Sequence, residues 1–404
     1  MTYSMDGWSE PTFSENLEKA GVSRRDFLTY CGSLAAVFAA GSTVLGSPVA
    51  ANAEPLPGNV TADDIARAFD SVTKPNVIWL QLQECTGCME SVLRGSGTTV
   101  EDVVLNLLSV NYNELVMAAT GEAANKALED TVAEGGHILV VNGAVSRAEG
   151  GVCCMIGGET SEEVLKKSAK GAAAVLAVGA CSVYGGVQAA YPNPTGAVGV
   201  DTVLGSKSVI NVSGCPPIAE VILATIAYFL THGSAPKTDS QGRPLFAYDQ
   251  RIHDSCQRRP HFDAGQFVRT FDDEGARNGW CLYQVGCKGP STFSACPIIQ
   301  WNMHTSWPVK SGNPCIGCTE KDFFDKFTPF FSRLPNVPGF GVEGTAEKVG
   351  LGLVAATVAG IGLHAGATAI RKAASSKDSD EESLAAFGDE GASTSTNDAE
   401  TTAS

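Results

Sequence analysis

The sequence predicts an α/β fold built on a doubly wound parallel sheet, followed by a small irregular region and a C-terminal apolar helix. Three observations support this prediction. Short apolar segments alternate with helical ones in the first half, and Pro, Gly, aromatic and charged residues become more frequent after residue 233. One long segment near the C-terminus carries no formal charge. A length of 404 residues suggests two or three folded units.

The predicted strands are short, β-branched and almost continuously apolar. Such segments are typical of strands buried on both faces of a parallel sheet. They cover residues 76–82, 137–141, 174–178 and 208–212. Helical segments, for example 123–134 and 161–170, lie between them. This alternation predicts the doubly wound sheet.

Cysteines follow three of these strands. Cys85 and Cys88 come after the first, Cys181 after the third and Cys215 after the fourth. Parallel sheets place ligands beyond the carboxyl ends of their strands, so we expect four thiolates to converge. Four cysteines suit a [4Fe–4S] cluster. The alternatives are a structural zinc site, which usually draws on two CxxC pairs, and a thioredoxin-type CxxC, which needs neither of the other cysteines.

The second half contains seven further candidate ligands. They are His253, Cys256, Cys281, Cys287, Cys296, Cys315 and Cys318. Long apolar segments disappear here, so we expect stability to depend on cofactors rather than on a large core. Eleven ligands in all suit two four-ligand clusters and one three-ligand cluster.

The N-terminus predicts an export signal. Arg24 and Arg25 precede an apolar segment at 34–40, and Ala51-Asn52-Ala53 has the pattern of a signal-peptidase site. A twin-arginine signal implies export of a folded, cofactor-loaded protein; the alternative is a chance Arg-Arg pair on a surface helix. Cys31 lies in this signal and is not expected to be a ligand. The net charge of −16 argues against nucleic acid as a partner.

The uncharged segment 349–370 is long enough to cross a bilayer. Arg371 and Lys372 follow it and favour a cytoplasmic C-terminus with the body outside. A Gly/Ala-rich buried helix is the alternative. His364 in this segment could ligate a haem of a partner protein, or be a neutral interhelical histidine. The acidic tail beyond it should be disordered.

Together these residues resemble the small subunit of nickel–iron hydrogenases of the membrane-bound uptake type. The resemblance implies a flavodoxin-like fold followed by a cluster-binding cap, and it assigns ligands to three clusters. The proximal [4Fe–4S] cluster has Cys85, Cys88, Cys181 and Cys215, the distal [4Fe–4S] cluster has His253, Cys256, Cys281 and Cys287, and the medial [3Fe–4S] cluster has Cys296, Cys315 and Cys318.

The resemblance also implies partners and a function. A large subunit would hold the nickel–iron centre, and electrons from hydrogen oxidation would pass through the three clusters to a membrane cytochrome b and quinone. A pure electron carrier without a nickel–iron partner and a hydrogen sensor are the competing hypotheses. The related quinone-reductase subunit ordinarily lacks the cap, and sensors typically lack the export signal and membrane tail.

The resulting organisation divides the chain into six parts. They are a twin-arginine signal peptide at 1–53, a linker at 54–74, a flavodoxin-like domain at 75–232, an Fe–S domain at 233–340, a transmembrane helix at 348–372 and a disordered acidic tail at 373–404.

Some positions depart from relatives or fall outside their motifs. Gly87 and Ala189 correspond to extra proximal cysteines of oxygen-tolerant relatives, so a standard, oxygen-sensitive cluster is expected. Pro308 stands where some relatives have a fourth medial cysteine. Cys153 and Cys154 match no motif and are expected to be buried thiols.

Overall fold

The computed structural model describes residues 32, 75–95, 108–205, 209–302, 304–333 and 354–372. These residues fall into two compact units, the body of the protein and a C-terminal unit that contains an apolar helix. The predicted signal peptide (with the exception of residue 32), the linker and the acidic tail lie outside the described residues.

The body contains a five-stranded sheet in which every neighbouring pair is parallel. Its strands are β1 (Asn76–Gln81), β2 (Ser109–Asn113), β3 (Ile138–Asn142), β6 (Ala174–Val178) and β7 (Val209–Val212). Their spatial order is β2-β1-β3-β6-β7, which is the order of flavodoxin-like doubly wound sheets. The four predicted strands are therefore confirmed, each to within a residue at either end.

The sequence did not reveal β2, which forms one edge of the sheet. Its sequence, Ser-Val-Asn-Tyr-Asn, is mostly polar, and three of its five residues are only half-buried. An edge strand has a sheet neighbour on one side only, so it needs fewer apolar side chains than the central strands. The apolar pattern that identified the other strands is consequently missing from it.

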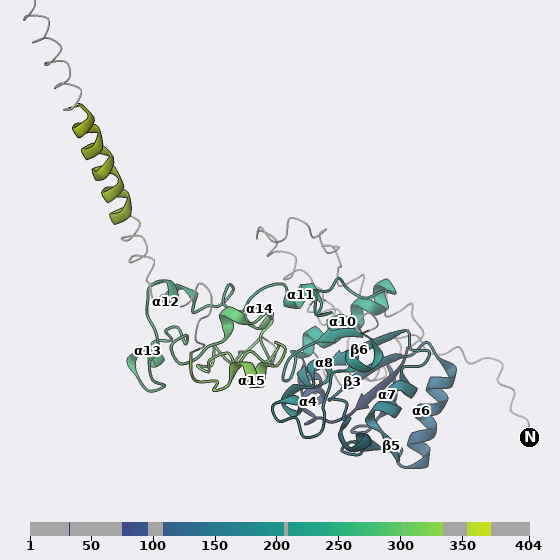
Figure 1. Ribbon diagram of the computed structural model, residues 1–404. Coiled ribbons are helices and arrows are strands. Elements are labelled where there is room, and N and C mark those ends of the chain that lie inside the picture. The colour runs from purple at the N-terminus through teal and green to yellow at the C-terminus, as the bar shows by residue number, and fades with distance from the viewer. Residues whose placement is uncertain are drawn as a thin grey trace, which may run out of the picture. The chain divides into compact units, whose positions relative to one another are not determined.

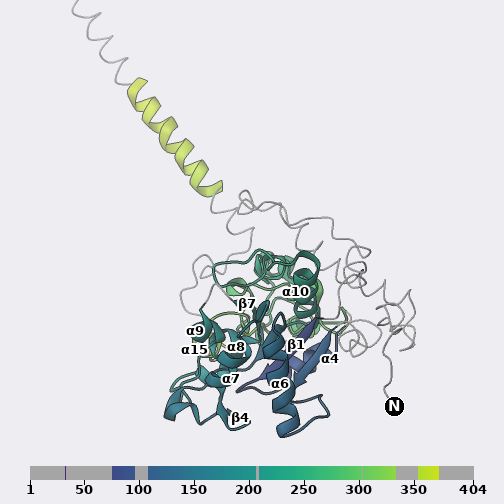
Figure 2. The ribbon, with the colours of Figure 1, turned by 90° about the vertical axis from the view of Figure 1, so that its right-hand side faces the viewer.

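Helices cover both faces of the sheet (Figure 2). On one face, Ile78 and Leu80 of β1 belong to a core shared with α6 (Glu122–Glu134), α7 (Ser161–Ser168) and α9 (Val200–Leu204). On the other face, Val77 and Trp79 belong to a core shared with α4 (Gly87–Leu93) and α10 (Ala219–His232). The predicted helices correspond to α6 and α7, while the nearly all-apolar α10 was not predicted.

Short elements shape the edge of the sheet where the cysteines lie. They include α8 (Ala180–Tyr184) and the 3₁₀ helices η2 (Ala148–Gly151) and η3 (Gly186–Ala189). A small antiparallel hairpin pairs β4 (Met155–Ile156) with β5 (Glu159–Thr160) and leads directly into α7. Thr160 and Glu163 form a capping box there, which explains why α7 begins at Ser161.

An irregular cap follows α10 (Figure 1). Its helices are only three to five residues long. They are α11 (Leu245–Tyr248), α12 (Arg259–Asp263), α13 (Glu274–Arg277), η5 (Gly289–Ser291), α14 (Cys296–Ile299) and α15 (Phe323–Phe327). Cap residues such as Phe246, Leu282 and Trp307 share the hydrophobic core of α10, so cap and sheet pack as one body.

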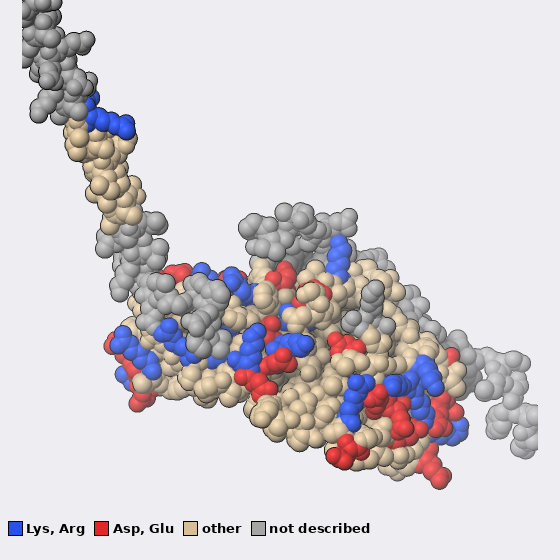
Figure 3. Space-filling model, viewed as in Figure 1, with Lys and Arg blue, Asp and Glu red and all other residues tan. Residues whose placement is uncertain are grey.

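The C-terminal unit contains a helix at Val354–Lys372. This helix is long and apolar enough to cross a membrane, and all of its residues are exposed. Figure 3 shows its surface without charge except for basic side chains at one end, where Arg371 and Lys372 lie.

Candidate functional site: three groups of cysteines

Cys85, Cys88, Cys181 and Cys215, which we call the proximal group, follow the carboxyl ends of three strands. Cys85 and Cys88 follow β1, with Cys88 in the first turn of α4. Cys181 lies in α8 directly after β6, and Cys215 lies three residues after β7. Because parallel strands present their carboxyl ends at one edge, the fold brings these residues together as the sequence predicts.

Cys88 lies within electrostatic reach of the other three thiols of the proximal group. Burial raises the pKa of Cys88 well above its ordinary range, and the thiolates of Cys181, Cys215 and Cys85 raise it further. Burial likewise raises the pKa of Cys215 to about 12. Four crowded thiolates repel one another, so this site favours a positively charged occupant such as iron.

Glycines let the backbone approach these sulfurs closely. A Cβ added at Gly179 would lie 2.4 Å from Cys88 Sγ, and one added at Gly186 would lie 2.6 Å from Cys181 Sγ. Both glycines have positive φ, which other residues rarely adopt. A Cβ at Gly87 would lie 3.3 Å from Cys85 Sγ. Glycine thus leaves the space beside these sulfurs free, and at Gly179 and Gly186 the positive φ also favours glycine.

Cys296, Cys315 and Cys318 form a second group, the medial group. Cys296 begins α14, and its Sγ lies 3.0 Å from Ser294 Oγ. The backbone N–H of Gly317 donates to Cys315 Sγ at 3.4 Å. Burial raises the pKa of Cys315 well above its usual range, and the thiolates of Cys287, Cys318 and Cys296 contribute further. These three sulfurs are therefore neighbours in a water-poor environment.

His253, Cys256, Cys281 and Cys287 form the third group, the distal group. All four line one common cavity in the cap. The backbone N–H of His253 donates to the Gly289 carbonyl, and the His253 side chain is almost fully buried. Burial raises the pKa of Cys281 to about 12, with added contributions from Cys287 and Cys256. The predicted grouping of a histidine with these three cysteines is consistent with this cavity.

Direct contacts connect the three groups in a row. Ser213 Oγ donates to the Thr319 carbonyl at 2.9 Å, which joins the segments of Cys215 and Cys318, and the Cys318 thiolate adds to burial in raising the pKa of Cys215, so the proximal and medial groups adjoin. The backbone N–H of Cys315 donates to Cys287 Sγ at 3.4 Å, so the medial and distal groups touch as well. The order along the row is proximal, medial, distal.

The donor sets suit clusters better than single ions. Among the residues that the structure describes, no three Cys, His, Asp or Glu side chains converge tightly enough to bind one metal ion. Cysteine thiolates arranged around a wider space are the ordinary ligands of iron–sulfur clusters, with histidine as an occasional substitute. Glycine backbone at the sulfurs provides the close approach and N–H donors that such clusters use.

A pocket of about 290 Å³ lies beside the proximal group. It is lined by residues from α4, including Gly87 and Arg94, and by Pro216, which follows Cys215. Trp301 and Asn302 of the cap complete one side of it. Cys85 and Cys215 are themselves exposed, so this end of the row faces the outside of the chain.

Some predicted positions have other environments. The expectation that Cys153 and Cys154 are buried thiols is wrong for Cys153, which is exposed, while Cys154 is half-buried. Both lie in the turn between η2 and the β4–β5 hairpin, a surface connection in which Val152 is exposed as well. Pro308 is exposed beside the buried Trp307.

Two carboxylates near the proximal group make local contacts. Glu84 accepts a hydrogen bond from the backbone N–H of Thr86 at 2.7 Å, and burial raises its pKa. Glu90 is exposed and pairs with Arg94 at 3.1 Å.

Gly186 was not singled out as a site residue from the sequence. Ala189 was taken to correspond to an extra cysteine of oxygen-tolerant relatives, which stays a prediction, whereas the structure brings Gly186 against Cys181. The signal was present in the sequence, since Gly185 and Gly186 directly follow the helix that contains Cys181.

Comparison with known proteins separates the two halves of the body. Residues 248–331 match the family model that describes the C-terminal part of the NiFe/NiFeSe hydrogenase small subunit. Residues 85–229 match the family described as NADH ubiquinone oxidoreductase, 20 Kd subunit. The sheet half is therefore similar to a second family of oxidoreductases, whereas the cap matches a family model described for hydrogenases.

Relatives that align with about nine-tenths of the chain show which family it belongs to. The uptake hydrogenase small subunit of Azotobacter vinelandii is 44% identical over 363 residues, which cover 89% of this chain and 96% of that protein. This chain belongs to the small-subunit family of nickel–iron hydrogenases. Its members carry iron–sulfur clusters, pair with a nickel–iron large subunit and form part of an oxidoreductase.

Two further comparisons agree with the family. The uptake hydrogenase small subunit of Afipia carboxidovorans is 45% identical over 365 residues, covering 90% of this chain and 94% of that protein. The solved NiFeSe hydrogenase of Desulfomicrobium baculatum is 32% identical with a TM-score of 0.61, covering 65% of this chain and all of the matched chain. The prediction of an uptake-type hydrogenase small subunit is thus confirmed.

Proposed function

We propose that this protein conducts electrons through three iron–sulfur clusters held by the three groups of ligands. The proximal and distal groups would each hold a [4Fe–4S] cluster, and the medial group a [3Fe–4S] cluster. The observation that carries this proposal is the pair of hydrogen bonds that join the groups, from Ser213 Oγ to the Thr319 carbonyl between the proximal and medial segments and from the Cys315 N–H to Cys287 Sγ between the medial and distal groups.

When bound, these clusters supply one-electron transfer, from hydrogen oxidation at a nickel–iron centre in a large subunit to a membrane cytochrome b or another quinone-linked acceptor. The chain itself provides thiolates, backbone N–H donors and burial. Exposure of Cys85 and Cys215, together with the adjoining pocket, makes the proximal end the face for the large subunit. No residue of this chain is assigned a catalytic role on hydrogen.

The distal group differs from the other two groups because one of its proposed ligands is a histidine. Neutral imidazole in place of thiolate removes one negative charge from the ligand set, which usually raises the reduction potential of a cluster. His253 is buried against the edge of Phe262, with ring centroids 4.7 Å apart, so its ring is held in place. We assign the distal group as the exit for electrons.

The C-terminal helix is proposed to anchor the complex. Val354–Lys372 has the length and composition of a membrane span, and basic residues end it. Together with the twin-arginine signal proposed for residues 1–53, this would put the body on the periplasmic side and the C-terminus in the cytoplasm. His364 is exposed on this helix and is a candidate ligand or neighbour for a haem of the cytochrome b.

Cluster content tests the proposal. The purified complex should contain about eleven iron atoms per small subunit in its clusters, and the oxidised state should give the electron paramagnetic resonance signal of a [3Fe–4S] cluster. Replacing Cys315 by Ser should remove the [3Fe–4S] signal, whereas Cys153→Ser should leave the iron content unchanged. Zinc in place of iron, or an unchanged spectrum in Cys315→Ser, would contradict the assignment.

Oxygen sensitivity tests whether the proximal group holds a standard, oxygen-sensitive cluster. With Gly87, and no cysteine, beside Cys85, we expect hydrogen oxidation to cease in air. Hydrogen uptake measured amperometrically at rising oxygen should fall towards zero. Rapid, persistent oxidation of hydrogen in air would refute the expectation.

A further inference from the structure

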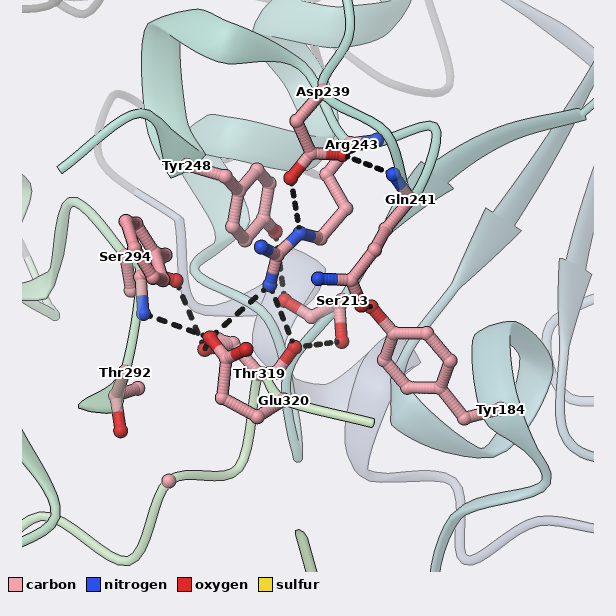
Figure 4. Close-up of polar contacts among 12 residues, drawn as sticks. Tyr184, Ser213, Asp239, Gln241, Arg243, Tyr248, Thr292, Ser294, Thr319 and Glu320 are labelled. Atoms are coloured by element: carbon pink, nitrogen blue, oxygen red, sulfur yellow. Dashed lines mark hydrogen bonds and ion pairs between the residues drawn. The ribbon is translucent and has the colours of Figure 1, made fainter. Parts of the chain in front are cut away.

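A buried arginine lies where the proximal and medial groups meet. Arg243 is only 2% exposed, and it stands between α10 and α11, where the sheet half gives way to the cap. Its Nε donates to Asp239 Oδ2 at 2.8 Å, and its Nη1 lies 3.2 Å from Glu320 Oε1 (Figure 4). One buried cation thus faces two carboxylates.

The guanidinium also binds the backbone next to a medial cysteine. Nη1 of Arg243 donates to the carbonyl of Thr319, which directly follows Cys318, at 3.0 Å. Ser213 Oγ donates to the same carbonyl at 2.9 Å, and Ser213 stands two residues before Cys215. The segments that bear Cys215 and Cys318 are therefore tied together at one carbonyl oxygen (Figure 4).

The partner carboxylate reaches the third segment. Glu320 Oε1 accepts a hydrogen bond from the backbone N–H of Phe293 at 2.8 Å, and Thr319 Oγ1 donates to the Phe293 carbonyl at 2.9 Å. Phe293 stands three residues before Cys296. Arg243 and Glu320 together thus hold the backbone beside two medial cysteines and one proximal cysteine.

This buried ion-pair network is not expected to add much to the free energy of unfolding. Buried ion pairs are weak contributors to stability, and well-packed apolar residues usually serve at least as well. What an apolar replacement could not provide is a fixed charge next to Cys318 and hydrogen bonds aimed at ligand-bearing segments. Glu320 is close enough for its charge to act on the Cys318 thiolate.

We propose that Arg243 is a positioning residue for the proximal–medial junction: it fixes the segments of Cys215 and Cys318 and compensates the charge of Glu320 beside the medial group. This inference rests on the proposed function, because it concerns the cluster that the medial group would hold. Without Arg243, the carboxylates of Asp239 and Glu320 lose their buried cation and disfavour the added electron; without Glu320, one negative charge beside the medial group is lost and the added electron is favoured.

Redox titration followed by electron paramagnetic resonance tests this on the intact complex. Arg243→Gln should lower the midpoint potential of the [3Fe–4S] signal, and Glu320→Gln should raise it. The double variant should return towards the wild-type potential. Arg147→Gln removes a comparable arginine–glutamate pair at the surface, 2.7 Å from Glu162 and away from the three groups, and should shift nothing.

The outcomes separate this inference from the proposed function. Wild-type complex without any [3Fe–4S] signal overturns both. A normal signal with unshifted potentials, or with shifts of the same sign in both single variants, overturns the role of Arg243 alone. Where Arg243→Gln does not assemble, Glu320→Gln decides by itself: a raised potential supports the inference, and an unchanged or lowered one overturns it.

Discussion

At the scale of single residues, glycine backbone lies directly against two sulfur atoms of the proximal group. Gly179 and Gly186 leave less than 3 Å between a hypothetical Cβ and a cysteine sulfur. A side chain there would occupy space beside the ligand, and the backbone would also be strained by its positive φ. These glycines should therefore matter for cluster binding as much as for folding.

Gly186→Ala tests this expectation against a matched control. The added methyl group would collide with Cys181, so we expect loss of the proximal cluster, about four iron atoms per chain. Gly233→Ala has nearly the same φ, +63° against +62°, but nothing lies within 4 Å of its Cβ. Iron analysis should show a deficit in Gly186→Ala alone; equal iron in both variants would sink the idea.

His253→Cys tests the exit role of the distal group. A thiolate in place of neutral imidazole should keep the cluster, lower its midpoint potential and change turnover with the physiological acceptor. His232→Cys, on the exposed end of α10, serves as the control. Unchanged turnover with every acceptor would count against electron exit at this end.

At the scale of elements, the ligands are organised by where strands and short helices end. Local sequence predicts a doubly wound parallel sheet but not the order of its strands, because local patterns do not specify which strands become neighbours. β2 was missed since its residues are polar, and α10 was missed since its apolar residues show no face. The cysteines after β1, β6 and β7 were predicted correctly to converge, because parallel strands end at a common edge.

Truncation tests the C-terminal helix as an element on its own. A chain that stops after residue 348 should be released from membranes while retaining hydrogen-dependent dye reduction, since the helix forms a unit separate from the body. A chain that stops after residue 373 keeps the helix and should stay membrane-bound. Retention of the shorter chain on the membrane, assayed by fractionation, would contradict the anchor.

At the scale of the whole molecule, the three groups lie in a row through the body of the protein. Their membership stays a prediction from spacing and resemblance, whereas the contacts that connect them could not be predicted from the sequence. Cys215 and Cys318 are about a hundred residues apart, and Arg243 is 76 residues from Thr319, to which it donates. Such long-range contacts depend on how the cap packs against the sheet, which local patterns do not report.

The match of the sheet half to a second oxidoreductase family has a physical reason. On the proposed function, the sheet with the proximal group would hold one cluster by itself, so such a half could also serve enzymes without hydrogen chemistry. The cap contains the seven further proposed ligands, and it is the cap that matches the hydrogenase family model.

Hydrogen-dependent dye reduction by the complex purified through this chain tests the central claim most directly. We predict activity, with a co-purifying large subunit, when the preparation is kept anaerobic and reductively activated. Iron and sulfide present without any hydrogen-dependent reduction would contradict the claim and favour a pure electron carrier that serves another dehydrogenase.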